Sequence, residues 1–177
     1  AVLVQRKMQN RKGEAKTVMD MAEIYQSIGQ PEQALKLNEE ALILSSELGS
    51  QDNEATIIMR MAEIYLPLDQ SQQALRLYLD ALSLYRALGK QDLEATLITK
   101  IALIYLDENL PDRALQLCEE ALPALQKTSY YEGEVTILMT MGMAYEKLAQ
   151  PLRALELYKP ILSIIDQTGT LKHTDFK

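Results

Sequence analysis

Apolar residues recur along the chain every three or four positions, in segments that short polar turns separate. In the first segment Val18, Met21 and Ala22 share one face, and the turn Gly29-Gln30-Pro31 follows. This spacing is typical of an amphipathic helix, and the strict alternation of a β-strand is absent. Glycine after such a segment and proline at the start of the next one indicate helix ends and helix starts. The pattern therefore predicts an all-α chain.

The same pattern returns every 40 residues. Four glutamates share one place in it, and four tyrosines share another: Glu14, Glu54, Glu94, Glu134, and Tyr25, Tyr65, Tyr105, Tyr145. Each block holds two helical patterns. First helices are predicted near residues 14–28, 54–68, 94–108 and 134–148, and second helices near 31–47, 71–87, 111–127 and 151–167. A fixed period in the range of about 20–50 residues indicates stacked units that bury their apolar faces against one another.

The period divides the chain into four repeats and two ends, which together form one solenoid domain. The repeats are residues 14–53, 54–93, 94–133 and 134–170, and residues 171–177 form a tail. Residues 1–13 match the end of a second helix, because Ala1-Val2-Leu3-Val4 aligns with Ala41-Leu42-Ile43-Leu44 at the same offset. We therefore expect residues 1–13 to end a truncated preceding repeat, and the chain to be cut from a longer array with an exposed terminal helix.

Several positions of the period have a predicted structural role. Small residues are expected to let the two helices of each hairpin approach closely, with Ala22, Ala62 and Ala102 facing Ala34, Ala74 and Ala114. Asp52 and Asp92 are predicted N-caps of the helices that follow them. By the same alignment Met21, Met61 and Met141 belong to the core, and Cys118 occupies the packing position of Tyr78 and Tyr158.

The order of these positions resembles the tetratricopeptide repeat. It reads Met21-Ala22-x-x-Tyr25, then Gly29-x-Pro31-x-x-Ala34 and Ala41, and it recurs four times over residues 14–170. The usual unit of that family has 34 residues. The longer unit here is similar to the variant found in kinesin light chains and G-protein-signalling modulators. The resemblance implies a right-handed α-solenoid of stacked antiparallel helix hairpins, whose first helices line a concave groove.

The resemblance also implies which residues face that groove. They mix apolar and charged side chains: Met19, Glu23, Met59, Arg60, Glu63, Lys100, Leu103, Met139 and Met143. Methionine is flexible and polarisable, and it suits surfaces that accept varied apolar partners. We therefore expect these residues to bind an amphipathic peptide or partner segment, as the interaction scaffold of a larger protein. The alternative is a structural role, in which the array packs against its own parent protein or forms a homodimer through the exposed terminal helix.

Composition narrows the function further. The formal net charge of −7 argues against a nucleic-acid partner, because phosphate binding requires clustered Lys and Arg. With His173 as the only histidine and Cys118 as the only cysteine, we expect no catalytic triad, metal site, disulfide framework or cofactor, and no enzyme. Apolar runs are far shorter than the roughly 20 residues that span a membrane. One cysteine is typical of a reducing compartment, and we expect a cytoplasmic location.

Overall fold

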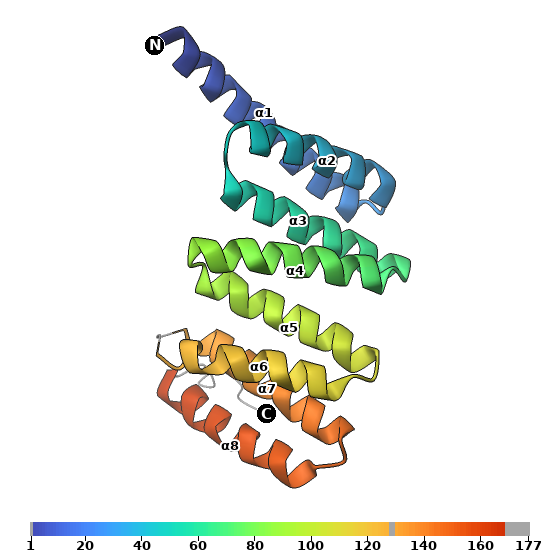
Figure 1. The fold of residues 1–177 in the computed structure, drawn as a ribbon, viewed down its shortest axis with the longest axis vertical. Coiled ribbons are helices and arrows are strands. Elements are labelled where there is room, and N and C mark those ends of the chain that lie inside the picture. The colour runs from blue at the N-terminus through green and yellow to red at the C-terminus, as the bar shows by residue number, and fades with distance from the viewer. Residues whose placement is uncertain (1, 128–129, 169–177) are drawn as a thin grey trace, which may run out of the picture. The chain divides into compact units, whose positions relative to one another are not determined.

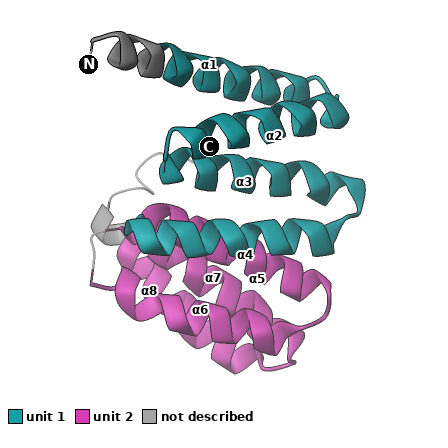
Figure 2. Cartoon of the chain, turned by 45° about the horizontal axis from the view of Figure 1, so that its top comes forward, with its two compact units in different colours: residues 1–90 teal, residues 91–177 magenta. Residues whose placement is uncertain are grey.

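The chain folds into helices throughout the part that the structure describes. This computed structural model describes residues 2–127 and 130–168, where it contains eight α-helices, one short 3-10 turn and no strand (Figure 1). The all-α prediction is therefore confirmed. Two compact units make up the chain, residues 1–90 and residues 91–177, and each contains two helix hairpins (Figure 2).

Unit 1 is built from four helices. Helices α1 (Val2–Ser27) and α2 (Pro31–Glu47) form its first hairpin. Helix α3 (Gln51–Tyr65), which the 3-10 turn η1 (Leu66–Leu68) extends, forms the second hairpin with α4 (Ser71–Leu88). Because α2 also packs against α3, the two hairpins share one core. Its buried members are Ala15, Val18, Ala41, Leu44, Ile57 and Met61.

Unit 2 repeats this arrangement. Helices α5 (Gln91–Asp107) and α6 (Pro111–Leu125) form one hairpin, and α7 (Tyr131–Lys147) and α8 (Pro151–Thr168) form the other. Helix α6 packs against α7, and the two first helices α5 and α7 are also in contact. The first helices of unit 2 therefore lie side by side, and their outward side chains can form one continuous surface.

The hairpin turns share one backbone conformation. The residue with positive φ recurs at the period of the repeat, at Gly29 (73°), Asp69 (57°), Asn109 (60°) and Ala149 (55°). The N–H group of the next residue then donates to the carbonyl oxygen of the tyrosine that recurs every 40 residues, as in the Gln30 to Tyr25 hydrogen bond of 2.9 Å. Such a left-handed residue satisfies the last carbonyls of a helix and reverses the chain. The same turn thus closes all four hairpins although only one of them has glycine there.

Small residues separate the helices of each hairpin, as the sequence predicts. All six alanines of the predicted contact are buried: Ala22, Ala34, Ala62, Ala74, Ala102 and Ala114. In the last hairpin the first-helix residue is Gly142, and a Cβ built there would overlap the ring of Tyr158. The Tyr158 hydroxyl donates to the Glu146 carboxylate at 2.9 Å. Glycine thus leaves the space that this tyrosine ring occupies.

The first helix begins earlier than predicted. Helix α1 starts at Val2 instead of near residue 14, and it runs through Gly13 without a break. Helices α2 and α4 end beside a glycine with positive φ, Gly49 and Gly89. The residue of α1 at the same repeat position is Gln9, and Gly13 does not have a positive φ. A glycine inside a helix costs about 1 kcal/mol relative to alanine, which is too little to end it. The predicted start of the first helix near residue 14 is therefore wrong.

Two further predictions of local structure are wrong. Asp52 and Asp92 are not N-caps but lie inside the first turns of α3 and α5. Their negative charges there stabilise the helices through the positive end of the helix dipole. Met21 is not in the core: 42% of it is exposed, while its equivalents Met61 and Met141 are buried. Helix α2 packs against the α3 face that carries Met61, and in the described residues no helix covers the same face of α1. The predicted tail, residues 171–177, lies outside the described residues.

Candidate protein-binding surface

In unit 1 the predicted binding residues lie on α1 and α3 and contact one another. The Arg60 guanidinium donates to the Glu23 carboxylate at 3.0 Å and to the Met19 carbonyl oxygen at 3.4 Å. Glu63 and Met59 are half-buried, and Met19 packs against the unit 1 core. The predicted binding residues of unit 1 therefore present an ion pair that bridges two first helices, while Met19 and Met59 are half-buried.

In unit 2 three of the predicted binding residues are exposed apolar side chains. The exposed fractions are 37% for Leu103, 50% for Met139 and 41% for Met143. Met139 and Met143 are one turn apart on α7, so they share a face of that helix. We call Leu103, Met139 and Met143 the apolar strip. Lys100 lies three residues before Leu103 on α5 and is half-buried.

A hollow of about 310 Å³ lies between α5 and α7, next to Lys100. Its walls combine small and hydroxyl-bearing residues with one lysine and one glutamate, from α5, α7 and the residue before α7: Ala95, Thr96, Thr99, Lys100, Tyr130, Glu132, Gly133 and Thr136. We call this space the α5–α7 hollow. Leu103 follows Thr99 by four residues, and Met139 follows Thr136 by three. Residues at these spacings share a helix face, so the apolar strip continues from the hollow.

Tyr130 forms one end of the α5–α7 hollow. Its ring lies over Gly133, where a Cβ would overlap it. Burial raises the pKa of Tyr130, and so do the negative charges of Glu132 and Asp92, while the hydrogen bond between the Tyr130 and Thr96 side chains opposes the shift. Two carboxylates therefore act on this end of the hollow.

The size of the hollow depends on a residue that differs between repeats. Thr99 lines it, while the same position of the other repeats holds Met19, Met59 and Met139. The Thr99 hydroxyl donates to the Ala95 carbonyl oxygen at 3.1 Å, which keeps this short side chain on its own helix. Sequence reasoning assigned Thr99 no binding role and missed Thr96, Tyr130, Gly133 and Thr136. The signal that could have found the hollow is the single threonine among three methionines.

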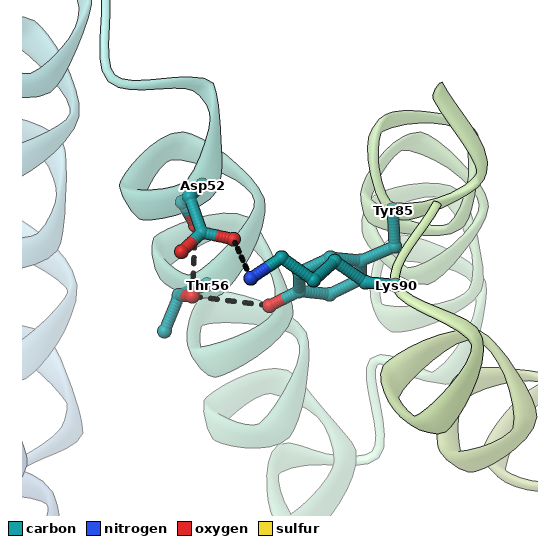
Figure 3. A network of polar contacts seen from close by, with 4 residues as sticks. All are labelled: Asp52, Thr56, Tyr85 and Lys90. Carbon is teal, nitrogen blue, oxygen red and sulfur yellow. Dashed lines mark hydrogen bonds and ion pairs between the residues drawn. The ribbon is translucent and has the colours of Figure 1, made fainter. Parts of the chain in front are cut away.

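In unit 1 a polar network fixes α3 on α4 (Figure 3). The Thr56 hydroxyl donates to the Asp52 carbonyl oxygen at 2.9 Å and lies 3.0 Å from the Tyr85 hydroxyl, so Tyr85 is the donor in that contact. Lys90 forms an ion pair with Asp52 at 3.4 Å. The contacts of Tyr85 and Lys90 join the end of α4 to the start of α3, and Tyr85 is fully buried. It thereby positions the helix that carries Met59, Arg60 and Glu63.

The described residues offer little reactive or metal-binding chemistry. Cys118 is fully buried, and burial raises the pKa of its thiol to about 12, so the thiol stays protonated at neutral pH. Within residues 2–127 and 130–168, no group of three His, Cys, Asp or Glu could hold a metal ion. In the same part of the chain no helix is both long and apolar enough to cross a membrane. His173 lies outside the described residues.

The chain is similar in sequence to one protein family and in fold to several solved structures. A family model of the tetratricopeptide repeat matches residues 14–90. Among solved structures, BtubC (BKLC) from P. vanneervenii is 21% identical with a TM-score of 0.76, over 92% of this chain and 67% of that one. A putative kinesin light chain from Podosopora anserina with nearly identical TPR-like repeats is 19% identical with a TM-score of 0.71, over 87% and 76%. Aspartyl phosphate phosphatase F from Bacillus subtilis is 16% identical with a TM-score of 0.80, over 91% and 42%. No curated protein matches significantly.

The fold and these similarities define the class as an all-α helical-repeat protein built from stacked hairpins. A tetratricopeptide-repeat model matches residues 14–90, and the solved structures of similar fold include TPR-like repeats, so the predicted resemblance to the tetratricopeptide-repeat family is confirmed. Proteins of the family generally mediate protein–protein interactions, and their repeats generally serve as scaffolds rather than as catalysts.

Proposed function

We propose that the chain binds a segment of a partner protein on the outward surface of its first helices, chiefly through the apolar strip of unit 2. The observation that carries the proposal is the exposure of Leu103, Met139 and Met143 on helices whose remaining apolar residues are largely buried. Grouped apolar side chains on a surface indicate an interaction site. Methionine can adapt its shape to the partner, which suits a site that accepts different apolar residues.

The strip can supply a useful part of the binding energy. Complete burial of one such side chain contributes about 1.5–3 kcal/mol. The three residues are already half-buried or more, so each has about 1 kcal/mol left to gain on binding. Together they supply about 3 kcal/mol, which corresponds to roughly a hundredfold in affinity. The strip is therefore an anchor for a partner segment that makes further contacts elsewhere.

Unit 1 and Lys100 supply polar contacts under the same proposal. The ion pair of Arg60 with Glu23 presents one charge of each sign beside Met19 and Met59, and Glu63 lies on the same helix as Arg60. A partner segment with mixed charges and apolar anchors fits these side chains. The array then acts as a cytoplasmic, non-enzymatic scaffold that binds protein rather than nucleic acid.

Peptide selection tests this proposal. A phage-displayed library of random 16-residue peptides is panned on the chain, and the affinity of the enriched peptides is measured by fluorescence anisotropy. Met139→Glu and Met143→Glu should each weaken binding by tenfold or more, because a carboxylate would be buried against apolar atoms. The matched control is Leu162→Glu, since Leu162 is an exposed leucine on the second helix α8. Equal losses in all three variants, with unchanged helicity, would refute the assignment of this surface.

The exposed face of α1 favours a second candidate function, self-association or packing against another part of the parent protein. Ile24 and Ile28 are 59% and 58% exposed, whereas Ile64, the equivalent of Ile24, is buried. Light scattering should detect a dimer that Ile24→Glu converts to a monomer. A wild-type chain that stays monomeric at high concentration would rule out the dimer.

A further inference from the structure

The two ends of the α5–α7 hollow differ in charge. Helices α5 and α7 each start with two carboxylates, Asp92 and Glu94 on one helix and Glu132 and Glu134 on the other. Glu132 lines the hollow, and both Asp92 and Glu132 act electrostatically on the Tyr130 hydroxyl. Lys100 lines the hollow further along α5. The space therefore runs from an acidic end at the helix starts to a basic side chain about two turns away.

The walls between these charges are mostly carbon. Ala95, Tyr130 and threonines from α5 and α7 line the space, and the threonine hydroxyls donate to carbonyl oxygens of their own helices. At about 310 Å³ it has room for one long side chain. A long side chain with an apolar stem and a polar head is matched by such a site, because the stem packs against carbon while the head reaches the charged end.

We propose that the α5–α7 hollow is a specificity pocket for one basic side chain, an arginine or lysine, of the partner segment that binds the apolar strip. This inference rests on the proposed function and names the chemistry of its partner. The aliphatic stem lies along the threonine methyl groups, and the cationic head lies between Glu132 and Asp92. The face of the Tyr130 ring adds cation–π attraction to that head. Residues on either side of the basic one then contact Leu103 and Met139.

Other side chains fit the hollow less well. An acidic side chain at the Tyr130 end would meet two carboxylates of the same charge. An apolar side chain would leave the exposed Glu132 carboxylate without a charge partner and would gain nothing from it. The charge of Lys100 also repels a cation from the other end, which fixes the direction in which the basic side chain enters.

Thr99 controls access to the pocket. Methionine is the residue that this chain itself uses at the equivalent places, Met19, Met59 and Met139. Thr99→Met should therefore fill the hollow without disturbing the helix, since methionine is a better helix former than threonine. Thr99→Val is the matched control because it keeps the size of the side chain and changes only its hydroxyl.

Peptide libraries provide the test. The probe is the random 16-residue library, panned in parallel on the wild type, Thr99→Val, Thr99→Met and Glu132→Gln. Peptides from the wild type and Thr99→Val should be enriched in Arg or Lys next to apolar residues. That enrichment should vanish with Thr99→Met and fall with Glu132→Gln. Replacing the basic residue of an enriched peptide by neutral citrulline or norleucine should weaken its binding about fivefold or more, and added salt should reduce the difference.

The outcomes separate this inference from the proposed function. Peptides that lose affinity with Met139→Glu but bind Thr99→Met as well as the wild type would overturn the pocket and leave the apolar strip standing. Enrichment of Asp or Glu in place of Arg or Lys would also overturn the pocket. A wild-type chain that enriches no peptide would overturn both. Circular dichroism of each variant shows whether it is folded.

Discussion

Ser45 is predicted to lower the stability of unit 1, so Ser45→Ala should stabilise the chain. Ser45 is completely buried on α2, and its hydroxyl oxygen has no hydrogen-bond partner. At the same position of the repeat, Tyr85 donates to Thr56, and Leu125 has no polar group to satisfy. The residue equivalent to Thr56 in the first repeat is Lys16, which is exposed and offers Ser45 no hydroxyl. The serine is therefore buried without the partner that the second repeat supplies.

The magnitude follows from two effects. A buried polar group that makes no hydrogen bond costs about 1–3 kcal/mol, and removing the group recovers that cost. Alanine also favours the helix by up to about 0.7 kcal/mol over an ordinary residue such as serine. Ser46→Ala on the same helix isolates the second effect, because Ser46 is exposed. Ser45→Ala should therefore exceed Ser46→Ala by about 1 kcal/mol or more in the free energy of unfolding.

Thermal unfolding followed by circular dichroism measures this difference. For a chain of this length 1 kcal/mol corresponds to about 2–4 °C in the midpoint. The midpoint of Ser45→Ala should therefore lie at least that far above the midpoint of Ser46→Ala. If Ser45→Ala instead unfolds at or below the wild-type temperature, the hydroxyl has a partner such as a buried water, and the reasoning is refuted.

Three further predictions concern the polar network, the surface ion pair and pH. Thr56→Val should destabilise unit 1 by about 1–3 kcal/mol, because it leaves the buried Tyr85 hydroxyl without a hydrogen-bond partner. Tyr85→Phe should cost less, because Thr56 keeps its hydrogen bond to the Asp52 carbonyl oxygen. Urea unfolding measures both variants. Glu23→Gln breaks an ion pair whose carboxylate partner is largely exposed, and it should change stability by less than about 1 kcal/mol in the same assay, so a larger loss would contradict this magnitude for the Arg60 contact. The raised pKa of Cys118 favours the neutral thiol in the folded chain, so the contribution of Cys118 to stability should be complete below about pH 9 and decline as pH rises toward 12. The free energy of unfolding of Cys118→Ala should decline less over that range.

Much of the fold could be predicted from the sequence because the same requirement appears four times. The buried alanines, the hairpin turns and the helix pairs all follow from the 40-residue period. The start of α1 could not be predicted by copying the period, because a helix continues until a residue ends it, and Gln9 and Gly13 do not. Met21 was misplaced for a related reason: its burial depends on a neighbouring helix, not on its own residue type.

The candidate site was harder to predict than the fold. The period identifies which first-helix residues can point outward, but it does not give their exposure. Met19 packs against the core of unit 1, while Met139 at the same repeat position is half-exposed. The α5–α7 hollow depends on Tyr130, which precedes α7 and lies outside the repeat motif. Side chains from two helices create such a space, so a pattern along one helix does not reveal it.

Methionine oxidation tests the central claim most directly. The chain is treated with dilute hydrogen peroxide, alone and saturated with a panned peptide, and the oxidation rate of each methionine is measured by mass spectrometry. Met139 and Met143 are exposed on the proposed binding surface, Met21 is exposed to a similar extent on the uncovered face of α1, and Met61 and Met141 are buried. The peptide should slow oxidation of Met139 and Met143 severalfold and leave Met21 unchanged. Protection of Met21 alone, or no protection of Met139 and Met143 by a saturating peptide, would contradict the account.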